Sequence, residues 1–320
     1  MYNEKYLNRI LELKKIMKNK SIDVFLISKP EDKFYLSGFE ASHYFIILIE
    51  DKNYLLTDFR YFEAANDKKD IFDIVRIDAH FSVFDFLSKY DKIKLGIEEK
   101  HLSALEYKKL LKQYSSENIV GGQEIIETQR MIKDKSELQL IKNAAEIADD
   151  AFKHLLAFIK PGLTEREVAL ELEFHMKKQG ASGLSFDTIV ASGKRSSLPH
   201  GTASDKILEK GDLITLDFGC IVECYSSDMT RTIALGQISD EQKRVYHIVK
   251  DAQERALKTL KAGIEASLAD KAARDIIEAE GFGEYFGHGL GHGVGLEVHE
   301  GPRLSPASEV FLEENMVVTV

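Results

Sequence analysis

The sequence predicts two domains, an α/β domain followed by an α+β domain. Its 320 residues exceed the usual range of a single core. Short strand-like and helical segments alternate up to the glycine pair at 121–122, whereas longer helices separated by strand pairs follow it. We therefore expect an N-terminal domain of residues 1–124 and a second domain of residues 125–320.

Apolar runs bounded by turn residues define the elements of the first domain. A helical apolar pattern covers residues 8–19. Strand-like runs and one short helix follow, the strands at 22–27, 45–49, 54–56, 71–77 and 92–97 and the helix at 60–66. The polar residues between the second and third strands predict a hairpin. We interpret the polar stretch at 124–135 as the connection between the domains.

Capping boxes predict where the helices of the second domain begin. In such a box the N-cap side chain and a Glu or Gln three residues later each satisfy the other's backbone N–H. The pairs are Asp134 with Glu137, Thr164 with Glu167, and Ser239 with Gln242. Strand-like segments lie between the second and third helices, at 188–191, 213–220 and 228–235. Helices separated by antiparallel strands are typical of an α+β domain.

The charge balance and the cysteine content exclude several classes of function. The chain has 43 Lys and Arg against 53 Asp and Glu, and its net charge of −10 disfavours nucleic acid and acidic membranes as partners. Its two cysteines, Cys220 and Cys224, are too few for a disulfide framework and suit a reducing compartment. No leader-like segment or bilayer-spanning apolar run is visible. We expect a cytoplasmic protein with no nucleic-acid or membrane partner.

Asp217 and Asp228 are the first candidates for a functional site. Each lies in a β-favouring apolar run, and a buried carboxylate needs a cation, hydrogen-bond donors or a proton. If the two strands pair, the carboxylates converge, because cross-strand neighbours are about 5 Å apart, and converging anions favour a metal ion. An equally weighted alternative pairs Asp228 with Arg231 or a hydroxyl and places Asp217 in a turn.

A glycine-rich segment at residues 287–300 contains three histidines, His288, His292 and His299. Five glycines at alternate positions leave room for a ligand or ion close to the backbone. His200 lies in a separate Pro-His-Gly loop, where substrate contacts are common. Carboxylates and imidazoles without thiolates favour a divalent Mn, Co, Fe or Zn ion.

Together these motifs resemble the pita-bread metallopeptidases, in the branch of Xaa-Pro dipeptidase (prolidase) and aminopeptidase P. The motifs are the segment 185–201, the strands of the two aspartates, and Gly-His-Gly-Leu-Gly-His-Gly within 287–300. Residues 35–39 and 56–61 resemble the creatinase-like N-terminal domain of that branch. The resemblance implies an α+β pita-bread catalytic domain after an α/β domain. It also implies hydrolysis of the N-terminal Xaa-Pro peptide bond by a metal-activated water.

The resemblance implies a role for each motif residue. The implied metal ligands are Asp217, Asp228, which bridges both ions, and His292. The implied catalytic residues, which contact the substrate and steady the tetrahedral intermediate, are His288 and His299, and His200 lines the entrance to the proline pocket. Two divalent ions per subunit are implied, with Mn or Co favoured over Zn or Fe. The implied partners are Xaa-Pro dipeptides or longer peptides and a second copy in a homodimer.

The resemblance further implies two glutamate ligands that the sequence does not contain. In the family they follow a strand similar to residues 315–320, whereas Glu313 and Glu314 precede that segment. We therefore expect the sequence to be a fragment that ends before its last strands and, as it stands, to be inactive and to bind metal weakly.

Alternative functions remain open at this point. The residues do not separate a dipeptidase from an aminopeptidase P. A second class of function is a non-catalytic proline-peptide-binding protein or a metal-free, creatinase-like protein on the same fold. The presence of Asp217, Asp228 and His292 counts against this class, because a metal-free site does not need two buried carboxylates facing an imidazole.

Overall fold

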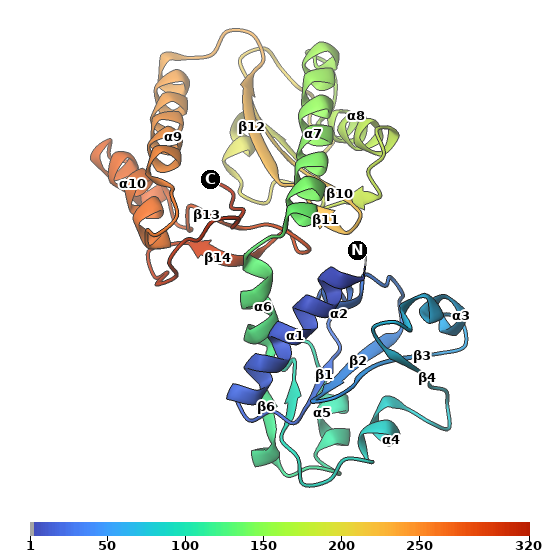
Figure 1. The fold of residues 1–320 in the computed structure, drawn as a ribbon. Coiled ribbons are helices and arrows are strands. Elements are labelled where there is room, and N and C mark those ends of the chain that lie inside the picture. The colour runs from blue at the N-terminus through green and yellow to red at the C-terminus, as the bar shows by residue number, and fades with distance from the viewer. Residues whose placement is uncertain (1–2) are drawn as a thin grey trace. The chain divides into compact units, whose positions relative to one another are not determined.

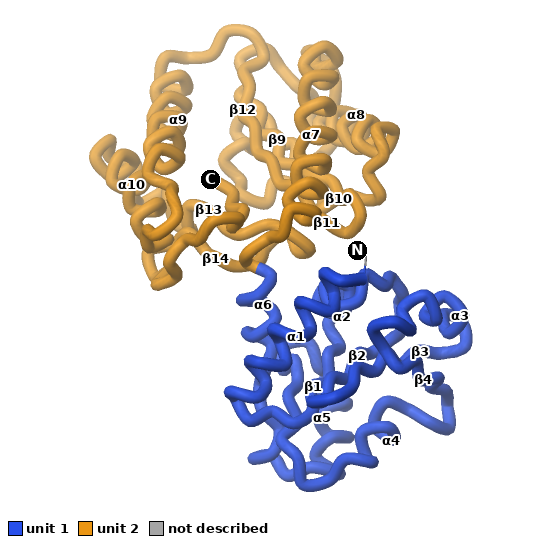
Figure 2. Tube along the Cα trace, in the orientation of Figure 1, with its two compact units in different colours: residues 1–130 blue, residues 131–320 orange. Residues whose placement is uncertain are grey.

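The computed structural model describes residues 3–320. The chain forms two compact units, residues 1–130 and residues 131–320 (Figure 2). The expected domain boundary between 124 and 125 falls inside helix α6 (Gln123–Met131). The stretch that we interpreted as a connection is helical because its buried Ile125 and Ile126 give it an apolar face.

The first unit is built on a six-stranded mixed sheet with the order β4-β3-β2-β1-β5-β6 (Figure 1). The strands are β1 (Val24–Ile27), β2 (Tyr44–Ile49), β3 (Asn53–Thr57), β4 (Asp73–Arg76), β5 (Leu95–Ile97) and β6 (Ile119–Gly121). The helices before α6 are α1 (Glu4–Asn19), α2 (Pro30–Ser37), α3 (Phe62–Ala65), α4 (Val83–Leu87) and α5 (Ala104–Leu110). The predicted hairpin is confirmed as the antiparallel pair β2–β3.

A buried pair of carboxyl groups lies at the carboxyl ends of β1 and β5. Glu98, directly after β5, accepts hydrogen bonds from the Lys29 backbone N–H at 2.6 Å and the Ser28 hydroxyl at 3.1 Å. Asp32, on α2, accepts one from Arg130 at 2.6 Å. Burial, the negative charge of Asp32 and a hydrogen bond between the two carboxyls raise the pKa of Glu98 to about 8. Because a carboxyl–carboxylate hydrogen bond requires a proton, we infer that the pair holds one at neutral pH.

Four long helices form the periphery of the second unit (Figure 1). They are α7 (Lys135–Phe158), α8 (Glu165–Lys178), α9 (Asp240–Thr259) and α10 (Ala266–Ala279). All three predicted capping boxes are confirmed, with Asp134, Thr164 and Ser239 as the N-caps of α7, α8 and α9. Within residues 3–320, no helix combines the length and the apolar character needed to cross a bilayer.

Short strands fill the space between these helices. One sheet has the order β12-β9-β8, with β8 (Ile189–Ser192), β9 (Leu213–Phe218) and β12 (Met229–Ala234). A second has the order β11-β10-β7, with β7 (Gly183–Leu184), β10 (Cys220–Val222) and β11 (Tyr225–Ser226). The pair β13 (Gly291–Gly293) and β14 (Glu300–Leu304) lies beside α10. Helices α7 and α8 bury Leu155 and Leu172 against Leu216 and Phe218 of β9.

The segment 315–320, which resembles a family strand, forms only isolated bridges. Met316 bridges to Ile132, and Val318 bridges to Gly293. The Thr319 backbone N–H also donates to the carbonyl oxygen of His292 at 2.8 Å. This segment therefore lies directly against the strand that carries His292.

Candidate metal centre

The two aspartates are brought together by the pairing of β9 with β12. The pairing of their strands, which the sequence left open, is formed and is antiparallel, with Asp217 directly opposite Thr230. Asp228 immediately precedes β12, so it lies diagonally from Asp217, two positions from Thr230 and on the same face of the sheet. The Thr230 hydroxyl donates to Oδ1 of Asp217 at 3.0 Å. The alternative pairing of Asp228 with Arg231 is not formed, because Arg231 instead donates to the Thr230 carbonyl.

Both carboxyl groups lie in an environment that disfavours their negative charge. Burial raises the pKa of Asp217 and outweighs the Thr230 hydrogen bond. Burial and the negative charge of Asp217 raise the pKa of Asp228 to about 6. A bound cation would relieve both penalties, because it stabilises the carboxylate form.

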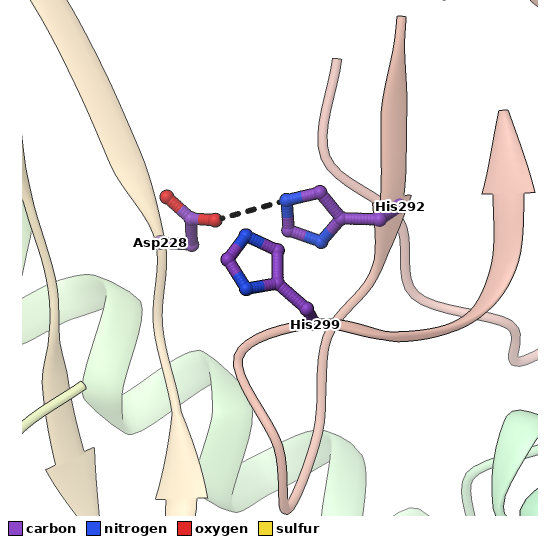
Figure 3. A group of neighbouring side chains, drawn as sticks. All are labelled: Asp228, His292 and His299. Atoms are coloured by element: carbon purple, nitrogen blue, oxygen red, sulfur yellow. Dashed lines mark ion pairs between the residues drawn. The ribbon is translucent and has the colours of Figure 1, made fainter. Parts of the chain in front are cut away.

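His292 directs one ring nitrogen at Asp228. Its Nδ1 lies 3.0 Å from the carbonyl oxygen of Gly293, so Nδ1 carries the proton and Nε2 presents its lone pair. Nε2 is 3.4 Å from Oδ2 of Asp228 (Figure 3). Burial lowers the pKa of His292, which keeps the ring neutral. Two lone pairs therefore face each other, an arrangement that favours a cation between them.

His299 completes a group of three donors. One donor atom from each of Asp228, His292 and His299 lies within 4.8 Å of the other two (Figure 3). The two rings are 4.3 Å apart between centroids. Burial lowers the pKa of His299, and the neighbouring His292 lowers it further. The resemblance assigned His299 to catalysis, and the geometry also makes it a candidate ligand.

Two other predicted site residues, His200 and His288, lie outside this group of three donors. His200 is exposed, and two residues after it Thr202 bridges to Ile189, the residue that lies directly opposite Asp217. His288 is also exposed. Its ring packs against Phe286 with 5.0 Å between centroids, and its Nδ1 contacts the Gly289 carbonyl oxygen at 2.7 Å. His288 does not belong to the three-residue donor group.

The sequence reasoning missed a buried ion pair next to His299. The ammonium of Lys133, a residue only 2% exposed, lies 2.8 Å from Oε1 of Glu300 and 3.1 Å from the Met131 carbonyl oxygen. The pair ties the start of the second unit to the residue after His299. A lysine among apolar residues at 131–133 was the only signal, because its partner is far away in the chain.

Close backbone approach explains two glycines of the histidine segment. A Cβ at Gly291 would lie 2.0 Å from the Thr319 carbonyl oxygen, and one at Gly293 would lie 2.0 Å from the Gly301 carbonyl oxygen. No side chain fits at either position. The glycines on both sides of His292 therefore allow β13 to lie between two neighbouring segments.

The donor set fits a divalent metal ion. Two ligands about 2.1 Å from one ion are roughly 3.0–3.4 Å apart, which matches the Asp228–His292 separation of 3.4 Å. Carboxylate oxygens and neutral imidazoles are ligands that Mn, Co, Fe and Zn accept.

Comparisons with known proteins define the class. Residues 139–320 match Metallopeptidase family M24, and residues 9–132 match the Creatinase/Prolidase N-terminal domain. The chain belongs to metallopeptidase family M24. This membership confirms the predicted pita-bread catalytic domain after a creatinase-like α/β domain, and it makes the protein a hydrolase of a family that uses divalent metal ions.

Individual relatives cover nearly the whole chain. The Xaa-Pro dipeptidase of Pyrococcus horikoshii is 41% identical over 324 residues, 99% of this chain and 89% of the relative. The solved Xaa-Pro dipeptidase from Bacillus anthracis superposes with a TM-score of 0.93 and is 41% identical, covering 98% of this chain and 88% of that one. The X-Pro aminopeptidase from Thermotoga maritima has a TM-score of 0.83 and 43% identity, covering 93% and 86%.

Proposed function

We propose that the protein hydrolyses the peptide bond that precedes proline at the N-terminus of its substrate and that it uses divalent metal ions to do so. The observation that carries this proposal is the convergence of donor atoms from Asp228, His292 and His299 within 4.8 Å, beside the half-buried Asp217. Relatives that are named for Xaa-Pro cleavage and are about 40% identical support the choice of substrate.

We assign metal binding to the two carboxyl groups whose pKa is raised and to the neutral imidazole that faces one of them. Asp217, Asp228 and His292 would hold the ions, and Thr230 would orient Asp217 through its hydroxyl. Bound divalent ions lower the pKa of a coordinated water and polarise the scissile carbonyl.

The other histidines would act on the substrate. The ring of His299, held neutral beside His292, has one N–H, which can donate to the developing oxyanion or to the leaving nitrogen. We assign His288 to the same step and His200 to contact with the proline ring. The amide that precedes proline is tertiary and has no N–H, so its recognition depends on the shape of the pocket that receives the proline ring.

The finer features of the proposal follow the family resemblance. We propose two ions per subunit, Mn or Co, in a cytoplasmic homodimer. We also propose domains at 1–124 and 125–320, although the two compact units of the structure divide between Arg130 and Met131.

A substrate panel tests the proposed function. The protein is incubated with Mn²⁺ and with Ala-Pro, Ala-Pro-Ala, Ala-Ala and Ala-Ala-Ala. Metal-dependent cleavage of Ala-Pro alone indicates a dipeptidase, and cleavage of both proline peptides indicates an aminopeptidase P. Absence of proline-dependent cleavage, together with chelator-resistant binding of Ala-Pro, would instead favour a non-catalytic binding protein.

A further inference from the structure

The loop that carries His200 is closed at both ends by one carboxylate. Glu165, the first residue of α8, has no exposed surface. Its Oε1 accepts hydrogen bonds from the Ser192 backbone N–H at 2.7 Å and the Ser192 hydroxyl at 2.8 Å. Its Oε2 accepts them from the Ser204 backbone N–H at 3.1 Å and the Ser204 hydroxyl at 2.6 Å. Each oxygen therefore holds one end of the segment 192–204.

Two basic side chains connect this carboxylate with the rest of the loop. Arg195 donates from Nε to Oε2 of Glu165 at 3.0 Å and from Nη2 to the Thr202 carbonyl oxygen at 2.7 Å. Lys206 donates to the Ser192 hydroxyl oxygen at 2.9 Å. Hydrogen bonds from Ser204 and Ser192 outweigh the effect of burial and lower the pKa of Glu165, so the group is a carboxylate at neutral pH.

The loop is held next to the candidate metal centre. Strand β8, which ends at Ser192, pairs with β9, and Ile189 lies directly opposite Asp217. Thr202 of the same loop, two residues after His200, bridges to Ile189. A shift of either loop end would therefore change the position of His200 relative to Asp217.

We propose that Glu165 is a positioning residue for substrate binding, which fixes both ends of the loop 192–204 and thereby sets where His200 meets the substrate. The proposal rests on the proposed Xaa-Pro hydrolysis. Glu165 does not touch the reacting atoms. Its effect on the substrate passes through His200.

The variant Glu165→Gln removes the hydrogen-bond acceptor for one of the two loop ends. A glutamine keeps the size of the side chain but replaces one acceptor oxygen by an NH₂ group, so one backbone N–H, of Ser192 or of Ser204, faces a donor. We expect KM for Ala-Pro to rise about tenfold or more and kcat to change less than about twofold. In a His200→Ala background the same substitution should have no further effect on KM, because the loop then has no ring to position.

The matched control is Glu167→Gln on the same helical turn. Glu167 is exposed and closes the capping box with Thr164, and it makes no bond to the loop. We expect E167Q to leave KM unchanged. Ser204→Ala removes only one donor to Oε2 and should raise KM less than E165Q does, which keeps the test valid if E165Q folds poorly.

Hydrogen exchange tests the anchor without reference to catalysis. We expect at least one of the Ser192 and Ser204 amides to exchange faster in E165Q, and both to exchange at the wild-type rate in E167Q. Equal exchange in E165Q and wild type would show that Glu165 does not anchor the loop. Independent, multiplicative effects of E165Q and H200A on KM would show that Glu165 does not act through His200. A wild-type protein that cleaves no Xaa-Pro bond overturns the proposed function and the substrate role of His200, and the exchange result then decides the anchor alone.

Discussion

Asp228 has an environment unlike that of an ordinary surface aspartate. Burial and the charge of Asp217 raise its pKa to about 6, and a neutral His292 directs a lone pair at it from 3.4 Å. Both features are unfavourable until a positive charge lies between the two groups. The environment of Asp228 therefore favours a role in cation binding over a role in stabilising the fold.

Replacing Asp228 by asparagine should remove most of the affinity for metal. The amide keeps the shape of the side chain but carries no negative charge, so we expect Mn²⁺ binding to weaken about 100-fold or more. Isothermal calorimetry measures the change. The control is Asp251→Asn, an exposed aspartate on α9, which should bind Mn²⁺ as wild type does. Equal affinity of D228N and D251N would contradict the site.

The Thr230 hydroxyl should tune the same site more weakly. Thr230→Val keeps the β-branched shape but removes the hydrogen bond to Asp217, and we expect metal affinity to fall about tenfold. Thr230→Ser retains the hydroxyl and should restore affinity to near the wild-type value. Equal losses in both variants would show that strand packing, not the hydroxyl, matters at this position.

Helix α7 depends on its first residues. The Asp134 side chain accepts hydrogen bonds from the backbone N–H groups of Ser136 and Glu137, and the Glu137 carboxylate accepts one from the Asp134 backbone N–H. Such a cap stabilises a helix by about 1 kcal/mol. These contacts are local in sequence, which is why the start of α7 could be predicted.

Asp134→Ala should lower the unfolding midpoint of the protein. Loss of the cap is expected to reduce the midpoint by about 2–4 °C, measured by circular dichroism. Asp134→Ser retains an N-cap acceptor and should lose much less. An unchanged midpoint in D134A would show that tertiary packing alone fixes the start of α7.

The same distinction between local and distant contacts explains the elements that the sequence did not reveal. No helix was expected between the strand-like runs at 22–27 and 45–49, yet Pro30 begins α2, because proline is favoured at a first helical position. Helix α6 was hidden in a polar stretch with few apolar residues. Both helices are stabilised by the buried ion pair of Asp32 with Arg130, residues distant in sequence.

For the site, the sequence left the pairing of β9 with β12 open and did not indicate its register. Strands β10 and β11 lie between the two in sequence and join another sheet, so the diagonal placement of Asp228 depends on tertiary structure. The sequence also did not rank the histidines of 287–300. His292 lies on β13 and His299 lies directly before β14, and both belong to the donor group, whereas His288 precedes β13.

At the scale of the whole molecule, each unit has its own apolar core, and the first also contains a protonated carboxyl pair. Leu26, Ile47 and Leu95 belong to the core of the first unit, and Ala148, Leu172 and Phe218 belong to that of the second. The proton of the Asp32–Glu98 pair makes the stability of the first unit sensitive to pH.

Stability should fall as pH rises from about 4.5 to about 8. The folded chain, with the pKa of Glu98 raised to about 8, binds a proton in this range that the unfolded chain has lost, so raising the pH favours unfolding. Glu98→Gln mimics the protonated acid and should flatten this dependence. We expect E98Q to be more stable than wild type at pH 9 and no more stable at pH 5, by thermal unfolding.

The control for this prediction is Glu99→Gln. Glu99 is exposed and adjacent in sequence, so its replacement should leave the slope of stability against pH unchanged. Parallel curves for wild type and E98Q would contradict a shared proton.

The tight fit of Gly291 and Gly293 affects how mutational scanning of this segment should be interpreted. Alanine at either position would place a methyl group 2.0 Å from a carbonyl oxygen, Thr319 in one case and Gly301 in the other. Such variants would displace the His292 backbone and abolish turnover as completely as loss of its imidazole. In a library selected for growth, all three positions would look equally intolerant. Titration of folded variants with Mn²⁺ would then distinguish the steric effect of alanine at Gly291 or Gly293 from the loss of the His292 nitrogen that we propose as a ligand.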